Sequence, residues 1–287
     1  MFPELNNILN TSPDKFEQGQ FILVSDSKTD GTFLIHHFIS FYLKAGCRVC
    51  VLGLVQSFSH YSAVGQRLGV SLPQAREKGQ LVFLEGLRGS LDVLLQDGPI
   101  PDTAQPLGFL RSPVPELRGL FEFVQSSLSS TEEEVAAWGP PVLIVDDLSV
   151  LLSLGVSPGA VLDFVHYCRV AVCSRMQGNM VTLVHNEEEE LGDEDSELLL
   201  RSLTHQSSLT LQDTGSCHWL LQGHPRTDGA EMEGRQSGSA WKRPGQAVPV
   251  QGPGQGCVFL RSGHLQCSAV RAGTGPHAAH PGESTSC

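Results

Sequence analysis

The chain has 287 residues, of which 40% are hydrophobic and 17% charged, and this composition is typical of a soluble globular protein. Its 19 Lys and Arg side chains against 31 Asp and Glu give a net charge of -12, which argues against a broad, sequence-independent nucleic-acid binder. The longest apolar stretch, residues 142–156, is interrupted by two aspartates, so the sequence predicts no membrane span. The first ten residues lack the regions of a signal peptide, so we expect an intracellular protein whose eight cysteines are reduced.

Six short apolar runs follow one another along the chain and predict six strands. The runs are apolar throughout instead of alternating, which is typical of parallel strands covered on both faces. Between the runs, apolar residues recur at helical spacing, for example Leu34, Phe38 and Phe41. The sequence therefore predicts an α/β fold, a three-layer sandwich with a mostly parallel central sheet. The expected strands are residues 21–24, 49–55, 81–84, 142–145, 180–184 and 209–211, with helices within 34–42, 61–68, 117–128 and 161–172.

Two segments differ in composition from this pattern. Residues 187–197 carry eight carboxylates and are expected to form a solvated loop, without the regular ligand alternation of a calcium site. From residue 213 onward, about a quarter of the residues are Gly or Pro and no apolar periodicity remains. We therefore predict a folded domain over residues 1–212 and a divergent, largely disordered tail over 213–287.

The segment 21–38 runs from a predicted strand through a loop into a helix, which is the setting of a phosphate-binding loop. When Gly31 is aligned with the second glycine of the GxxxxGK[ST] pattern, Asp26 replaces the first glycine. Thr32 then stands where the phosphate-binding lysine belongs, and Phe33 stands where the magnesium-binding hydroxyl belongs. Without that lysine the loop loses a charge-assisted contact of roughly 1.5–3 kcal/mol. The sequence therefore predicts a degenerate loop that does not hydrolyse ATP unaided.

Four further residues are candidates for roles in or beside the same site. Lys28 is a cation within the loop, and Asp30 is a candidate N-cap of the following helix. Asp146 and Asp147 end the fourth predicted strand, where a magnesium-binding carboxylate would stand in a nucleotide site. We interpret them as degenerate too, and we expect Asp147 or Ser149 to cap the next helix.

Other motifs indicate structural roles. The GxSxG match at residues 155–159 has a proline after its serine, so it lacks the amide that an oxyanion hole needs. Cys47 and Cys50 enter a strand instead of opening a helix, and no second CxxC pair completes a zinc site. The tail residues Cys257, His264 and Cys267 have irregular spacing. The histidines are also interpreted as structural: His36, His37, His60, His166 and His185. We therefore predict no catalytic residue, no cofactor and no metal.

Several strings resemble the Elongator complex protein 6 family from residue 1 to about 211. They are QSFSHY at 56–61, LVFLEGL at 81–87, VDDLSVLLSLG at 145–155 and VLDFVHYCR at 161–169. The resemblance implies a RecA-like fold without the residues for ATP hydrolysis. It also implies a heterohexameric ring with Elongator proteins 4 and 5 that binds tRNA. The ring would support modification of the wobble uridine, U34, whose chemistry belongs to the catalytic Elongator subcomplex, in the cytoplasm with the nucleus as a second location.

Two alternative functions remain open, and the chain departs from the family at its C-terminus. The chain could be an ATP-dependent enzyme with a divergent phosphate loop that uses Lys28, Asp146 and Asp147, or an interaction module that uses its acidic segment 187–197. The family continues into further strands after the sixth, whereas this chain continues into the Gly/Pro-rich tail. We therefore expect the sheet edge at 209–211 to be left unpaired, which either invites aggregation or requires another chain to cover it.

Overall fold

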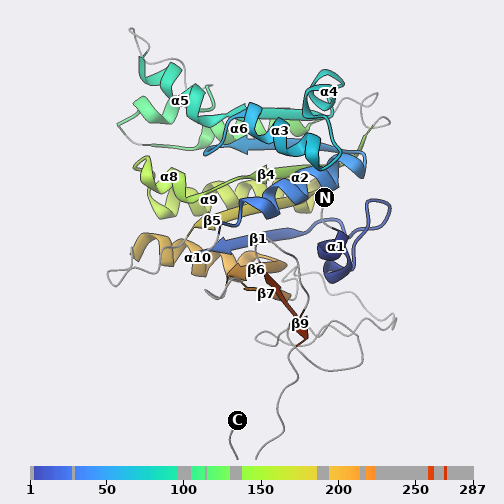
Figure 1. The fold of residues 1–287 in the computed structure, drawn as a ribbon. Coiled ribbons are helices and arrows are strands. Elements are labelled where there is room, and N and C mark those ends of the chain that lie inside the picture. Colours follow the sequence, from blue (N-terminus) through green and yellow to red (C-terminus); the bar gives the residue numbers. More distant parts are fainter. Residues whose placement is uncertain are drawn as a thin grey trace, which may run out of the picture.

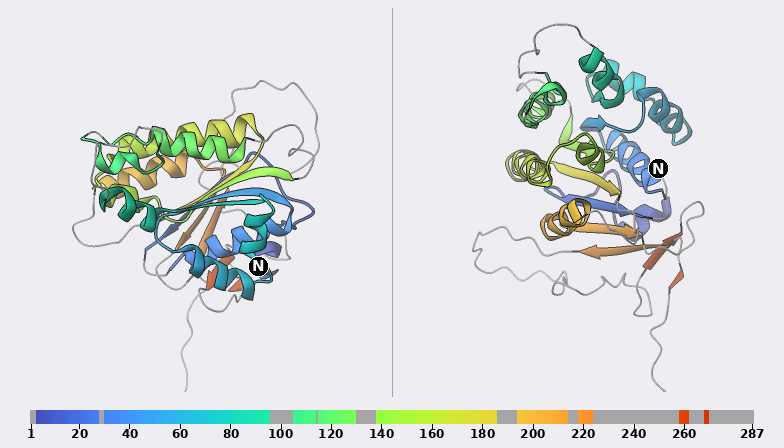
Figure 2. Two further views of the ribbon diagram at one scale, coloured as in Figure 1. Left: turned by 90° about the horizontal axis from the view of Figure 1, so that it is seen from above. Right: turned by 90° about the vertical axis from the view of Figure 1, so that its left-hand side faces the viewer.

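The computed structural model describes residues 3–27, 30–95, 105–113, 115–129, 138–185, 194–213, 218–223, 258–261 and 268–269. These residues form a central sheet with helices on both faces (Figures 1 and 2). The strand order is β3-β2-β4-β5-β1-β6-β7-β8-β9. The strands are β1 (Phe21–Asp26), β2 (Cys47–Gly53), β3 (Leu81–Glu85), β4 (Gly139–Val145), β5 (Asn179–His185), β6 (Leu209–Asp213), β7 (His218–Gly223), β8 (Val258–Arg261) and β9 (Ser268–Ala269).

The strands from β3 to β6 in this order pair in parallel, and they correspond to the six predicted runs. One layer of helices covers the face that includes Val49 and Val51, and it consists of α1 (Pro3–Leu9), α2 (Thr32–Lys44), α3 (Phe58–Arg67) and α4 (Leu72–Glu77). The other layer consists of α5 (Gly86–Leu95), α6 (Arg118–Leu128), α8 (Ser149–Ser153), α9 (Pro158–Arg169) and α10 (Glu194–Gln206), with a 3-10 turn η1 (Gly108–Arg111) and a π-helical turn η2 (Val170–Arg175). The predicted RecA-like three-layer α/β sandwich is confirmed.

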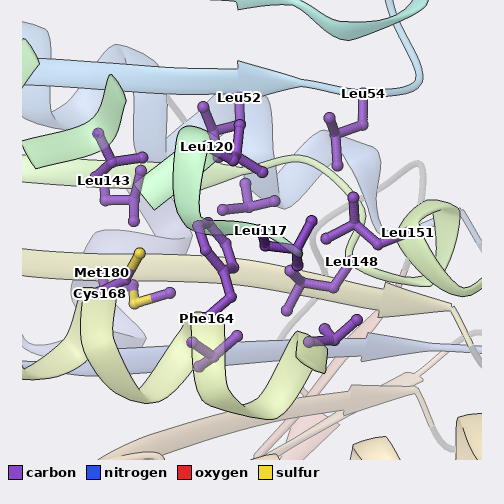
Figure 3. Close-up of a cluster of buried hydrophobic side chains, with 14 of the residues drawn as sticks. Leu52, Leu54, Leu117, Leu120, Leu143, Leu148, Leu151, Phe164, Cys168 and Met180 are labelled. Atoms are coloured by element: carbon purple, nitrogen blue, oxygen red, sulfur yellow. The ribbon is translucent and has the colours of Figure 1, made fainter. Parts of the chain in front are cut away.

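Successive residues of the central strands enter opposite cores. In β2, Cys50 and Leu52 pack under the layer of α6 and α9, whereas Val49 and Val51 pack under the layer of α2. Figure 3 shows the first core, in which Leu52 and Leu143 from the sheet lie near Phe164 and Cys168 of α9. Because both faces are buried, apolar residues occupy most positions in these strands, and this produces the continuous runs seen in the sequence.

The edge of β6 is paired, which corrects the expectation for residues 209–211. Strand β7 runs antiparallel to β6, with Leu209 opposite Gly223 and Asp213 opposite Trp219. Strand β8 then pairs with β7, and β9 pairs with β8. The segment 218–223 supplies the backbone donors and acceptors that β6 would otherwise expose. Most of the tail lies outside the described residues, so its disorder stays a prediction.

The second strand and the acidic segment have different boundaries from those expected. The second strand ends at Gly53, so residues 54–55 belong to the following loop. The acidic segment was expected to be a loop through residue 197, but α10 begins at Glu194, and its first turn contains Glu194, Asp195 and Glu197. Carboxylates are favourable at that end of a helix, since the exposed amides there carry partial positive charge. Residues 187–193 lie outside the described residues. Among the described helices, none combines the length and apolar character needed to cross a bilayer.

Candidate functional site

The fold brings the predicted phosphate loop and carboxylate pair to one edge of the sheet. In open α/β sheets, ligands bind outside the carboxyl ends of the strands. Asp26 ends β1, His185 ends β5, and Asp146 follows the last residue of β4. Strand β5 lies between β1 and β4, so one strand separates the two aspartates. The candidate site therefore has the location of a nucleotide site.

Asp26 is buried, and both of its carboxylate oxygens have partners within the chain. Its Oδ2 atom accepts a hydrogen bond from the Gly31 amide at 2.6 Å, and its Oδ1 atom lies 2.7 Å from Nδ1 of His185. Burial raises the pKa of Asp26, and the contacts with Gly31 and His185 oppose this shift. Asp26 thus binds a loop amide of the kind that a phosphate-binding loop offers to its ligand.

The N-terminus of α2 has a second internal carboxylate partner. Asp30 accepts the amide hydrogen of Thr32 through Oδ1 at 2.8 Å. Asp30 is not the N-cap that the sequence predicts, because the helix begins at Thr32 and Gly31 occupies the N-cap position. Phe33, at the place of the magnesium-binding hydroxyl, packs against the core under α2. Lys28 lies outside the described residues.

Asp146 is almost fully buried and accepts four hydrogen bonds. Its Oδ1 atom accepts from the amide of Leu54 at 2.7 Å, and its Oδ2 atom accepts from the amides of Val55 and Gln56 at 3.1 and 3.4 Å and from the Tyr61 hydroxyl at 3.1 Å. Burial raises the pKa of Asp146, whereas these four donors lower it. This carboxylate fixes the loop that follows β2, and its oxygens are directed at backbone and tyrosine donors.

Asp147 is not the N-cap that the sequence predicts, because Leu148 occupies that position, but its side chain binds the first amide of α8. Its Oδ1 atom accepts the amide hydrogen of Ser149, the first residue of α8, at 2.8 Å. Burial chiefly raises the pKa of Asp147 to about 6, and the charges of Asp146 and Asp26 act in the same direction. Ser149 does not cap the helix; its hydroxyl donates to the His185 carbonyl at 3.0 Å and accepts from the His185 amide at 2.9 Å. Ser149 therefore joins the start of α8 to the end of β5.

The arrangement does not fit magnesium and a triphosphate. No group of three or more His, Cys, Asp or Glu within the described ranges is placed to hold a metal ion. Asp146 and Asp26 are engaged with donors of the same chain, and two amides near the start of α2 already bind carboxylates. A triphosphate would meet negative charge here instead of free donors. We therefore derive no catalytic step at this edge.

The other sequence motifs also have structural partners. Cys47 and Cys50 face opposite cores, and burial raises the pKa of each thiol to about 12, so neither is a thiolate at neutral pH. Ser157 of the GxSxG match caps α9 by accepting the Ala160 amide hydrogen at 3.3 Å. Burial lowers the pKa of His36 to about 4 and keeps its ring neutral. Cys257, His264 and Cys267 lie outside the described residues.

Sequence reasoning did not identify the side chains that bind Asp26 and Asp146. His185 ends an apolar run, and Tyr61 belongs to a predicted helix, so both stood in the sequence as ordinary structural residues. The contacts between Asp26 and His185 and between Asp146 and Tyr61 join residues distant in the chain. No local spacing indicates them.

Comparisons with known proteins show which family the chain resembles over most of its length. A family model described as Elongation complex protein 6 matches residues 2–222. The chain is 58% identical to Elongator complex protein 6 of Danio rerio, over 86% of this chain and 88% of that protein. It is 53% identical to the Homo sapiens protein of that name, with the same coverage. A crystal structure of an uncharacterised Pyrococcus horikoshii protein with an unknown peptide superposes with a TM-score of 0.50 and 14% identity, covering 77% of this chain and 89% of that one, which supports the fold alone.

The similarity extends further along the chain than the sequence strings indicate. The family model reaches residue 222 and so includes β7, beyond the expected departure near residue 213. The alignment with the Danio rerio protein covers more of this chain than residues 1–212 could supply. The matched region thus includes the whole parallel sheet and the strand that pairs with its edge. From residue 2 to residue 222, this chain belongs to the Elongator complex protein 6 family.

Proposed function

We propose that this chain is a non-catalytic subunit of a hexameric RecA-like ring in the Elongator complex, with Elongator proteins 4 and 5. The ring binds tRNA and supports modification of the wobble uridine, U34, by the catalytic Elongator subcomplex. Its location is the cytoplasm, with the nucleus as a second site. The family assignment supports membership of the complex, because the relatives carry its name.

One observation carries the non-catalytic part of the proposal: the candidate site is filled by the chain's own carboxylates. Asp146 accepts from three backbone amides and one hydroxyl, so both of its oxygens are engaged with donors of its own chain. Asp26 binds the Gly31 amide through one oxygen, and its other oxygen lies 2.7 Å from Nδ1 of His185. The fold is kept while its nucleotide-binding groups serve internal contacts, which suits a subunit that acts through assembly.

The test uses the full chain, alone and co-expressed with Elongator proteins 4 and 5. We expect the chain alone to show neither ATP hydrolysis nor stabilisation against heat by nucleotide. We expect the three proteins to elute together from size-exclusion chromatography and to retain added tRNA. Separate elution would contradict the ring. Hydrolysis by the chain alone that is lost in Asp147→Asn would instead support an ATP-dependent enzyme, since asparagine keeps an oxygen for the Ser149 amide.

A further inference from the structure

Helix α5 has a row of exposed leucines on its outer side. Leu87, Leu91, Leu94 and Leu95 are 57%, 53%, 55% and 77% exposed. Their spacing of four, three and one residues places them on one side of the helix, and we call them the leucine face of α5. Of the eight large hydrophobic residues that are exposed in the described part of the chain, these four lie on this single helix. The concentration distinguishes the face from scattered surface leucines, which need no explanation.

The opposite side of α5 is fixed against the sheet and cannot turn to bury the leucines. A Cβ atom added at Gly86 would lie 2.9 Å from the Cα atom of Leu54, and one added at Gly89 would lie 2.7 Å from a methyl carbon of Leu107. Val93 is buried in the core under α6 and α9. Because the contact at Gly86 is with backbone atoms, rotation of the helix would bring a larger side chain into a place where only glycine fits. The leucine face is therefore held outward by the packing of the inner side.

Few polar groups separate the two apolar sides of α5. Ser90 donates its hydroxyl hydrogen to the Gly86 carbonyl at 2.7 Å, so this group is satisfied within the helix. Arg88 and Asp92 are the charged residues of α5, and both are exposed. A helix that is apolar on nearly all sides is typical of a buried position. Helix α5 follows β3, the strand at one end of the sheet, and lies at the periphery of the fold (Figure 1).

We propose that the leucine face of α5 packs against an apolar surface on a different, less acidic subunit of the Elongator complex. A second copy of this chain would bring another net charge of -12, and like charges oppose such a contact. Four leucines are also fewer than the roughly 20–30 residues that each partner contributes to a stable interface. The face is therefore the apolar anchor of a larger contact, with Arg88 and Asp92 at its rim. This inference rests on the proposed function and names the surface that the assembly would use.

The first experiment compares the double variant Leu91→Gln and Leu94→Gln with the control Leu198→Gln. Leu198 lies on α10 and is 52% exposed, so it matches the two leucines in exposure but belongs to another helix. Glutamine keeps a similar helix propensity. Full-length chains are co-expressed with Elongator proteins 4 and 5 and recovered by affinity purification. We expect the double variant to recover at least about tenfold less of the partners, since loss of central apolar anchors weakens interfaces strongly, and the control to behave as the unmodified chain.

The outcomes separate this inference from the proposed function. Failure of the unmodified chain to recover its partners would overturn the proposed function, and the docking surface with it. Equal recovery by the double variant, when the unmodified chain does assemble, would overturn the docking surface alone. Light scattering of the isolated chains tests for self-association. If the unmodified chain forms a dimer and the double variant does not, the leucine face binds a second copy of this chain. That result would overturn the assigned partner.

A second experiment measures the accessibility of the leucine face with a substitution that preserves the fold. Leu95 is the most exposed residue of the leucine face, so Leu95→Cys places a thiol there with little effect on packing. Cys47, Cys50, Cys168 and Cys173 are buried, and mass spectrometry of the peptide that contains position 95 distinguishes the new thiol from all others. We expect maleimide to modify it rapidly in the isolated chain and at least about tenfold more slowly in the purified assembly. Equal rates in both would overturn the proposal.

Discussion

Replacing Asp146 by alanine tests whether this carboxylate is a structural clamp or a retained metal ligand. The change leaves the Leu54 amide and the Tyr61 hydroxyl without their acceptor, and both hydrogen bonds are buried. An unpaired buried donor costs about 1–3 kcal/mol, whereas the part-buried amides of Val55 and Gln56 can bind water at small cost. Burying the charge of Asp146 costs free energy, as its raised pKa indicates, and removing the carboxylate removes this cost. That gain offsets part of the loss. We expect a net loss of about 2–4 kcal/mol in the free energy of unfolding.

Urea-induced unfolding, followed by circular dichroism at pH 7, measures this loss. The control is Asp163→Ala, which removes an exposed carboxylate from α9 and is expected to change the free energy of unfolding by less than about 0.5 kcal/mol. A carboxylate retained for a metal would give the opposite sign, because removing a buried negative charge from a functional site generally stabilises a protein. Unchanged or increased stability of the Asp146→Ala chain would therefore refute the clamp.

Three further changes test neighbouring contacts. Tyr61→Phe removes one donor to Asp146, and we expect a loss of about 1–2 kcal/mol in urea unfolding; no loss would show that the hydroxyl is not needed. Gly86→Ala brings a Cβ within 2.9 Å of the Leu54 backbone and should lower the free energy of unfolding by about 1–3 kcal/mol; full stability would mean that α5 is free to shift. The pKa of Asp147 is raised from 3.8 to about 6 in the folded chain, so folding favours the protonated carboxyl. The free energy of unfolding of the unmodified chain therefore falls as the pH rises from about 4 to above 6, where this carboxyl loses its proton. The Asp147→Asn chain should therefore gain stability over the unmodified chain across this interval, by up to about 3 kcal/mol, and parallel pH profiles of the two chains would contradict the shift.

Much of the fold could be predicted because its strands are buried on both faces. Val142 and Ile144 of β4 enter one core, and Leu143 and Val145 enter the other, so all four positions of this run are buried and apolar. The leucines of α5 do recur at helical spacing, but they lie on its exposed side, so the apolar pattern alone would assign the wrong side of this helix to the core. Strand β7 lies in a segment whose composition indicates disorder, yet it supplies the partner that the edge of β6 requires.

The boundary of β2 shows how a distant contact can override a local pattern. Leu54 and Val55 continue the apolar run of β2, so the sequence alone extends the strand through residue 55. Asp146, which follows β4, accepts both of their amide hydrogens, and these amides therefore leave the ladder. The strand ends where this carboxylate begins to compete with the neighbouring strand for backbone donors. A contact across about ninety residues of chain leaves no trace in the spacing of either segment.

The candidate site illustrates the same limit from the chemical side. The sequence shows which groups a nucleotide site has lost, since the lysine and hydroxyl positions hold Thr32 and Phe33. It does not show that the remaining groups have new partners, because Asp26 meets His185 only when β1 and β5 pair. Asp26 both repels a phosphate and binds the Gly31 amide that a phosphate would need. Restoring a lysine at position 32 would therefore leave two obstacles to nucleotide binding in place, the charge of Asp26 and its hydrogen bond to the Gly31 amide.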